Sequence, residues 1–96
     1  MMSDYRFKDL FTRYHGNPII RAWDIPYNAN SVFNAGATRV GDETLLLMRV
    51  EDRRGMSHLT VARSKDGVTN WKIDPEPTLL PSPHTHPEEV WGIEDP

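Results

Sequence analysis

Cysteine is absent from the 96-residue sequence. Its absence excludes disulfide bonds, thiolate nucleophiles and zinc sites built on cysteine, and it is typical of the reducing cytoplasm, where we expect this chain to act. Long apolar runs are also missing: residues 45–48 form the longest and Arg49 ends it, whereas a membrane span needs about 20 residues. Residues 1–8 contain no apolar core, so we expect no secretory signal.

A surplus of positive charge is the third missing feature. The 11 Lys and Arg residues are outnumbered by 14 Asp and Glu residues, which gives a net charge of −3. A general nucleic-acid binder needs a basic footprint, so that class is excluded. The 38% hydrophobic and 26% charged residues are typical of a folded soluble protein, and the length allows one small domain.

Four β-prone runs occupy the middle of the sequence, at residues 32–40, 43–50, 57–64 and 71–73. Short polar links with Gly41, Gly55 and Gly67 join them, as in hairpins. The pattern predicts an all-β fold with one four-stranded antiparallel meander. Before it, aromatic spacing predicts a short helix at residues 6–14, with Asp4 as a possible cap. After it, five prolines within residues 74–90 predict a connector without regular ladders or helices.

A single meander buries little apolar surface, and its edges need partners. Such sheets form the blades of β-propellers, which close with 4–8 blades of roughly 40–50 residues each. We therefore expect the chain to hold one blade of a larger protein. The abrupt ending at residues 94–96, EDP, is interpreted as a truncation.

Two segments carry candidate binding chemistry. In residues 49–55, RVEDRRG, Arg49 and Glu51 share one side of a strand opposite Val50. A guanidinium and a carboxylate at a strand end can bind sugar hydroxyls or an anion, but the segment also fits a solvated hairpin loop. The amides of residues 28–37 suit a polyol ligand, or equally a turn stabilised by asparagine.

Three further segments contain residue types found in metal sites and catalytic sites. Residues 84–89, HTHPEE, offer imidazoles and carboxylates, but nothing fixes a third ligand, so no metal site is predicted. Residues 91–96, WGIEDP, contain adjacent carboxylates. One of them could have the raised pKa of a general acid, or the segment could be a surface turn. The Ser57-His58 pair lacks an ordered third member, and no catalytic triad is predicted.

Taken in order, several motifs resemble the start of glycoside hydrolase family 130, whose members are mostly phosphorylases of β-mannosides. The resemblance covers residues 5–96 and rests on residues 13–20 (RYHGNPII), 28–37, 45–55, 57–67 with Trp71, and 91–96. It implies a five-bladed β-propeller. Residues 1–31 would be the lead-in segment, 32–73 the first blade, and 74–96 the connector and the start of the second blade.

The resemblance also implies an activity. Inorganic phosphate would attack the anomeric carbon of a terminal β-mannosyl unit, linked β-1,4 or β-1,2, and give α-mannose 1-phosphate with inversion. Asp95 matches the family's general acid, whose proton is passed through the mannose 3-hydroxyl. Asn30, Ser31 and Arg49 match residues that contact mannose or the adjoining sugar, and Arg54 would reach the acceptor side. No cofactor or metal is implied, phosphate is a co-substrate, and a homo-oligomer is left open.

An inverting phosphorylase needs one acid and no general base, because phosphate is already an anionic nucleophile; an inverting hydrolase needs two carboxylates with a water between them. The family's phosphate-binding cations come largely from later blades, so residues 1–96 alone are expected to be inactive. Three alternatives stay open. They are a β-mannoside hydrolase of the same family, a non-catalytic carbohydrate-binding blade, and a small β protein that assembles its blades from several copies.

Overall fold

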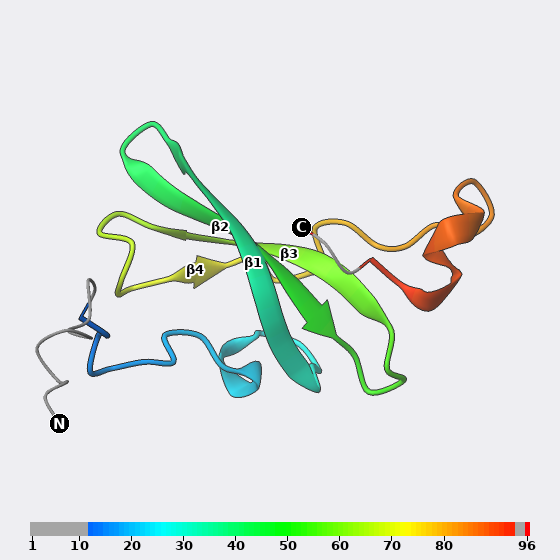
Figure 1. The fold of residues 1–96 in the computed structure, drawn as a ribbon, viewed down its shortest axis with the longest axis horizontal. Coiled ribbons are helices and arrows are strands. Elements are labelled where there is room, and N and C mark those ends of the chain that lie inside the picture. The colour runs from blue at the N-terminus through cyan, green and yellow to red at the C-terminus, as the bar shows by residue number, and fades with distance from the viewer. Residues whose placement is uncertain (1–11, 94–95) are drawn as a thin grey trace, which may run out of the picture.

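The structure, a computed structural model, describes residues 12–93 and 96 and contains one four-stranded antiparallel sheet in the order β1-β2-β3-β4 (Figure 1). Its strands are β1 (Ser31–Val40), β2 (Glu43–Glu51), β3 (Ser57–Ser64) and β4 (Lys72–Ile73). The predicted meander is therefore confirmed. β1 begins one residue earlier than predicted, at Ser31, and β2 ends one residue later, at Glu51. β4 begins at Lys72 and excludes Trp71.

The β1–β2 turn follows the chemistry that its sequence predicts. Gly41 has a φ of 62°, and the flanking residues Val40 and Glu43 pair across the turn. A two-residue hairpin turn requires positive φ at its first position, which glycine adopts without steric cost.

The β3–β4 loop is organised around one carboxylate. Asp66 accepts hydrogen bonds from the backbone N–H groups of Val68 and Thr69, at 2.8 Å each, and from the hydroxyls of Ser64 and Thr69. These bonds, those from Thr69 first, hold the pKa of Asp66 well below its usual range. Trp71 donates from Nε1 to the Val68 carbonyl at 3.0 Å. The loop is therefore ordered by its own side chains.

The main buried apolar cluster lies on one face of the sheet. Side chains alternate along β2, so Met48 and Val50 point to the same face and are fully buried there with Ala62 of β3. Ile25, from the segment that precedes β1, completes this buried cluster. The lead-in segment therefore covers the apolar face that a single sheet would leave exposed. It includes the short 3₁₀ helix η2 (Ala22–Asp24).

The segment after β4 corrects one prediction. It contains the 3₁₀ helix η3 (Pro87–Trp91), and it pairs with the outer edge of β3 at two isolated bridges, Leu59 to Leu79 and Ser57 to Gly92. Proline starts η3 because the first helical position needs no N–H and favours its fixed φ. The bridging residues lie between prolines and keep their own N–H groups.

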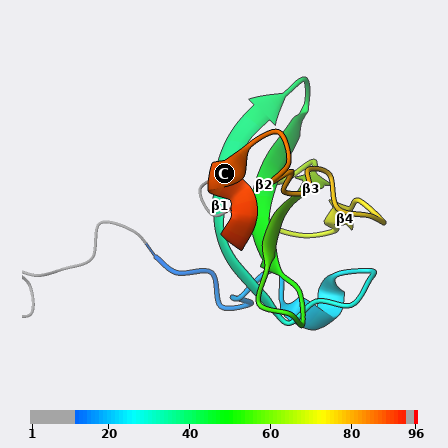
Figure 2. The ribbon, with the colours of Figure 1, turned by 90° about the vertical axis from the view of Figure 1, so that its right-hand side faces the viewer.

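Figures 1 and 2 show this segment looping away from the sheet through η3 before the C-terminal residue returns to it. Near the other end of the chain, residues 12–14 are not helical, contrary to prediction. The remainder of that predicted helix, like its possible cap Asp4, falls outside the described residues. In the described part of the chain, no helix has the length and apolar character needed to cross a membrane.

Candidate functional site

Three of the sequence-predicted site residues, Asn30, Ser31 and Arg49, lie at the same end of the sheet. β1 begins where β2 ends, so Ser31 pairs with Glu51, and Glu51 pairs in turn with Ser57 of β3. The register thus places polar side chains from three strands next to one another. We call Asn30, Ser31, Arg49, Glu51 and Ser57 the strand-end cluster.

An amide–carboxylate pair orders one half of the cluster. Asn30 donates from Nδ2 to Oε1 of Glu51 at 3.0 Å and, more weakly, to the Ser31 hydroxyl at 3.4 Å. Its backbone N–H also donates to the Glu51 carbonyl at 2.8 Å. Both residues retain exposed surface. The pair therefore presents oxygen acceptors to solvent in a fixed arrangement.

Arg49 orders the other half. It lies on the face opposite the buried Val50, together with Glu51, as the alternation of the sequence predicts. Its Nε donates to the buried hydroxyl of Ser57 at 2.9 Å. Its guanidinium lies over the ring of Phe33, 4.5 Å from the ring centroid, which is within the range of a cation–π contact.

An irregularity in β1 brings Phe33 to this position. The register shifts between Val32, which pairs with Val50, and Ala35, which pairs with Met48. Two residues of β1 thus stand opposite Arg49 alone, as in a β-bulge. Bulges re-aim side chains next to binding sites, and this one places an aromatic ring beneath the arginine.

Arg54 lies apart from the cluster, in the β2–β3 loop. Its side chain is 78% exposed, and it donates to Oδ2 of Asp52 at 2.8 Å. The hydrogen bond from Arg54 is the main reason that the pKa of Asp52 is lowered. The other oxygen of Asp52 accepts the backbone N–H groups of Arg54 and Met56. In this structure Arg54 organises its own loop.

Asp95, the predicted general acid, falls outside the described residues. The described residues nearest to it in sequence do contact the sheet. The Ile93 N–H donates to the Ser57 carbonyl at 2.9 Å, and Gly92 forms a parallel bridge with Ser57. The Pro96 carbonyl lies 3.3 Å from the position that a Cβ on Gly36 would take. Ser57 thus contacts Arg49 through its side chain and Ile93 through its backbone.

Ser57 and Phe33 were not among the predicted site residues, whereas Glu51 was predicted as the carboxylate beside Arg49 at the strand end. Glu51 had a signal, because it lies two positions after Arg49 on the same side of β2. Ser57 and Phe33 had none in the local pattern. Their roles depend on the strand register and on the bulge.

On the core face, Tyr27 of the lead-in segment joins two buried residues of β3. Its hydroxyl hydrogen-bonds His58 Nε2 at 2.6 Å and Thr60 Oγ1 at 2.5 Å. Desolvation raises the pKa of Tyr27 and lowers the pKa of His58. Both groups are therefore neutral near pH 7, and they tie the lead-in segment to the sheet.

The buried imidazole predicts a pH-dependent stability. The unfolded chain binds a proton at His58 with a pKa of about 6.5, whereas the folded chain binds it only at a lower pH. The free energy of unfolding should therefore fall as the pH drops below about 6.5, by at most about 1.4 kcal/mol per pH unit. Urea unfolding of His58→Gln between pH 7.5 and 5 should show a shallower slope. His86→Gln, at an exposed histidine, should leave it unchanged, and an equal slope in His58→Gln would contradict the assignment.

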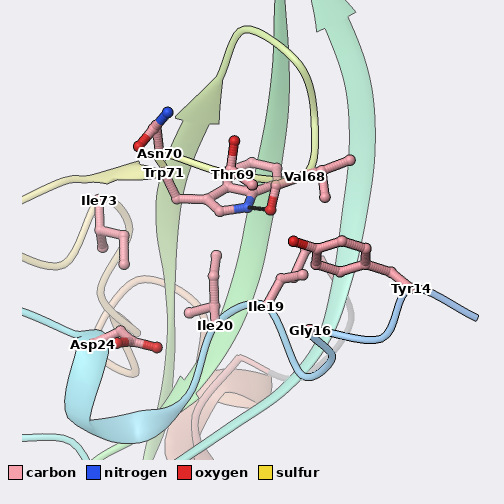
Figure 3. Close-up of a pocket in the computed structure, with 10 residues that line it drawn as sticks. All are labelled: Tyr14, Gly16, Ile19, Ile20, Asp24, Val68, Thr69, Asn70, Trp71 and Ile73. Carbon is pink, nitrogen blue, oxygen red and sulfur yellow. Dashed lines mark hydrogen bonds between the residues drawn. The ribbon is translucent and has the colours of Figure 1, made fainter.

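A cavity of about 380 Å³ lies elsewhere, between the lead-in segment and the β3–β4 loop. Figure 3 shows the Trp71 indole across from Tyr14, Ile19 and Ile20, with Nε1 bonded to the Val68 carbonyl. The Asp24 carboxylate at its margin already accepts the Arg21 N–H at 2.8 Å. The cavity is lined by both polar and apolar groups, and none of the strand-end cluster contributes to it.

Within residues 12–93 and 96, no three histidine, aspartate or glutamate side chains are grouped closely enough to hold a metal ion. No protein-family model matches the chain, and no curated protein is significantly similar to it. The function of the strand-end cluster is therefore proposed from its own geometry together with the motif resemblance.

Proposed function

We propose that this chain supplies the first blade of a five-bladed β-propeller that acts as an inverting β-mannoside phosphorylase, as its motifs imply by their resemblance to glycoside hydrolase family 130. The single observation that carries the proposal furthest is the strand-end cluster. It gathers Asn30, Ser31 and Arg49, three residues named from those motifs, at one end of an antiparallel four-stranded sheet.

The chemistry of the cluster suits a sugar. Arg49 offers N–H donors, while Asn30 and Glu51 offer oxygen acceptors, so neighbouring ring hydroxyls can donate and accept at once. The charges of Arg49 and Glu51 cancel, which disfavours a dianion such as phosphate at the same place. We therefore assign a neutral mannosyl ring to the cluster. Phosphate would be bound by cations from other parts of the propeller.

In the proposed reaction a phosphate oxygen forms a bond to the anomeric carbon while the glycosidic C–O bond breaks. The leaving oxygen takes a proton that originates on Asp95 and passes through the mannose 3-hydroxyl. The products are α-mannose 1-phosphate and a shortened acceptor. One carboxylic acid is sufficient, because phosphate needs no base to become a nucleophile.

The test is turnover by the protein expressed from its complete reading frame. β-1,4- and β-1,2-mannobiose are each incubated with the protein, with and without inorganic phosphate, and the products are followed by ³¹P NMR and by mannose release. We expect α-mannose 1-phosphate to form only when phosphate is present. Phosphate-independent release of mannose would identify a hydrolase instead, and no turnover of either disaccharide would favour a non-catalytic blade.

A further inference from the structure

We infer that Ser57 is a positioning residue: with Phe33 it fixes the guanidinium of Arg49 so that the two terminal nitrogens face a ligand. This inference rests on the proposed function, in that it takes Arg49 to bind the sugar. Ser57 itself would not contact the sugar. It acts through Arg49 alone.

The Ser57 hydroxyl accepts a hydrogen bond from one particular donor of Arg49, the Nε–H. A guanidinium carries five N–H donors in one plane. The Nε donor of Arg49 is used by the Ser57 hydroxyl at 2.9 Å, while its two Nη groups donate no hydrogen bond to any residue that the structure describes. A bond at Nε fixes the inner edge of the plane and leaves the outer fork for a ligand. That fork matches paired oxygens on a sugar or a carboxylate.

Phe33 restricts Arg49 at a different place, the face of the guanidinium. The Phe33 ring lies beneath it, 4.5 Å from centroid to Cζ. A contact in the plane and a contact on the face together oppose rotation about the last side-chain torsions. An arginine that is already ordered loses less rotamer entropy when a ligand binds, and affinity gains accordingly.

Ser57 is itself held rigidly. It is only 2% exposed. Its neighbours hold it from both sides, because β2 pairs with it at Glu51 and the Ile93 N–H donates to its carbonyl. A buried hydroxyl on a strand paired along both edges has little freedom to move. The Ser57 hydroxyl is therefore a fixed acceptor that holds the Nε of Arg49 in place.

A double-mutant cycle tests the inference in the complete protein. Ser57→Ala should lower kcat/KM for the mannobiose that is turned over about tenfold, since the arginine becomes loose. In an Arg49→Lys background, which has no Nε–H donor, the same Ser57→Ala change should alter kcat/KM less than about twofold. An equal loss in both backgrounds, or no loss in the Arg49 background, would overturn the inference.

Ser64→Ala is the matched control for the loss of a buried hydroxyl on β3. Ser64 is also 2% exposed, but it bonds Asp66 and the Thr69 carbonyl in the β3–β4 loop. We expect Ser64→Ala to leave kcat/KM unchanged. A tenfold fall in this variant too would mean that general loosening of β3, and not Arg49, explains the Ser57 effect.

A second measurement separates this inference from the proposed function. In arginine-labelled protein the Nε–H of Arg49 should exchange with water about tenfold more slowly than the Nε–H of exposed Arg53, and Ser57→Ala should abolish the difference. If turnover fails but this protection is present and lost as stated, the proposed function is wrong and the positioning stands. If protection is absent, or unaffected by Ser57→Ala, the positioning is wrong whatever the activity.

Discussion

Replacing Asp95 by asparagine is expected to lower kcat for phosphorolysis by about 10²- to 10⁴-fold, the range that a general acid contributes. Asparagine keeps the size of the side chain but has no acidic proton to pass through the mannose 3-hydroxyl to the leaving oxygen. The loss should therefore fall on kcat more than on KM. Steady-state kinetics with mannobiose and saturating phosphate measure both.

Asp42→Asn is the matched control, because it makes the same change of charge at an exposed aspartate. Asp42 lies in the β1–β2 turn, at the end of the sheet away from the strand-end cluster. Its turnover should stay within about twofold of the unchanged protein. Full activity in Asp95→Asn would show that Asp95 is not the general acid.

Replacing Gly92 by alanine should release the segment that precedes Asp95 from β3. Gly92 has φ 108° and ψ −174°, a region that is essentially restricted to glycine, and a Cβ there would lie 2.6 Å from the backbone nitrogen of Ser57. Strain of about 1–3 kcal/mol adds to the loss of the Ile93–Ser57 hydrogen bond, worth about 1 kcal/mol. Local opening should become easier by about 2–4 kcal/mol.

Hydrogen exchange with mass spectrometry of the peptide that contains residues 92–96 measures that opening. We expect exchange to accelerate on the order of 10²-fold, since each 1.4 kcal/mol corresponds to a factor of ten. Turnover should fall with it if this segment carries the acid.

Gly55→Ala is the control that separates backbone strain at a positive φ from the steric clash of a new Cβ. Gly55 also has positive φ, 84°, but a Cβ there would meet nothing within 4 Å. We expect this variant to show a modest loss of stability in its own loop and unchanged exchange in residues 92–96. Slow exchange retained in Gly92→Ala would mean that the bridge to Ser57 does not hold the segment.

Much of the sheet was predictable, because its determinants are local. β-prone runs between polar links that contain glycine define β2 and β3, and a glycine at the first turn position joins β1 to β2. The alternation of side chains along a strand correctly placed Arg49 and Glu51 on the face opposite Val50. The polar loop around Asp66 follows from hydrogen bonds between residues no more than five positions apart.

Prediction failed where one short segment was considered without its surroundings. Residues 12–14, the described end of the predicted helix, are not helical. Prolines were taken to prevent any regular structure after β4, yet Pro87 starts η3, and Leu79 between prolines still pairs with Leu59. The proline rule removes one N–H at a time, so it does not forbid pairing by the residues between.

The sequence by itself determined the strands, their turns and the polar character of the β2 end, since each of these depends on residues within about ten positions. Only the tertiary structure decided that Ile25 closes the core, that Phe33 bulges beneath Arg49, and that Ser57 binds both Arg49 and the segment at Ile93. Those contacts depend on strand register and on which distant segment covers each face and edge. Register and coverage are set by the free energy of burying apolar surface and pairing backbone groups across the whole chain, which no short stretch of sequence contains.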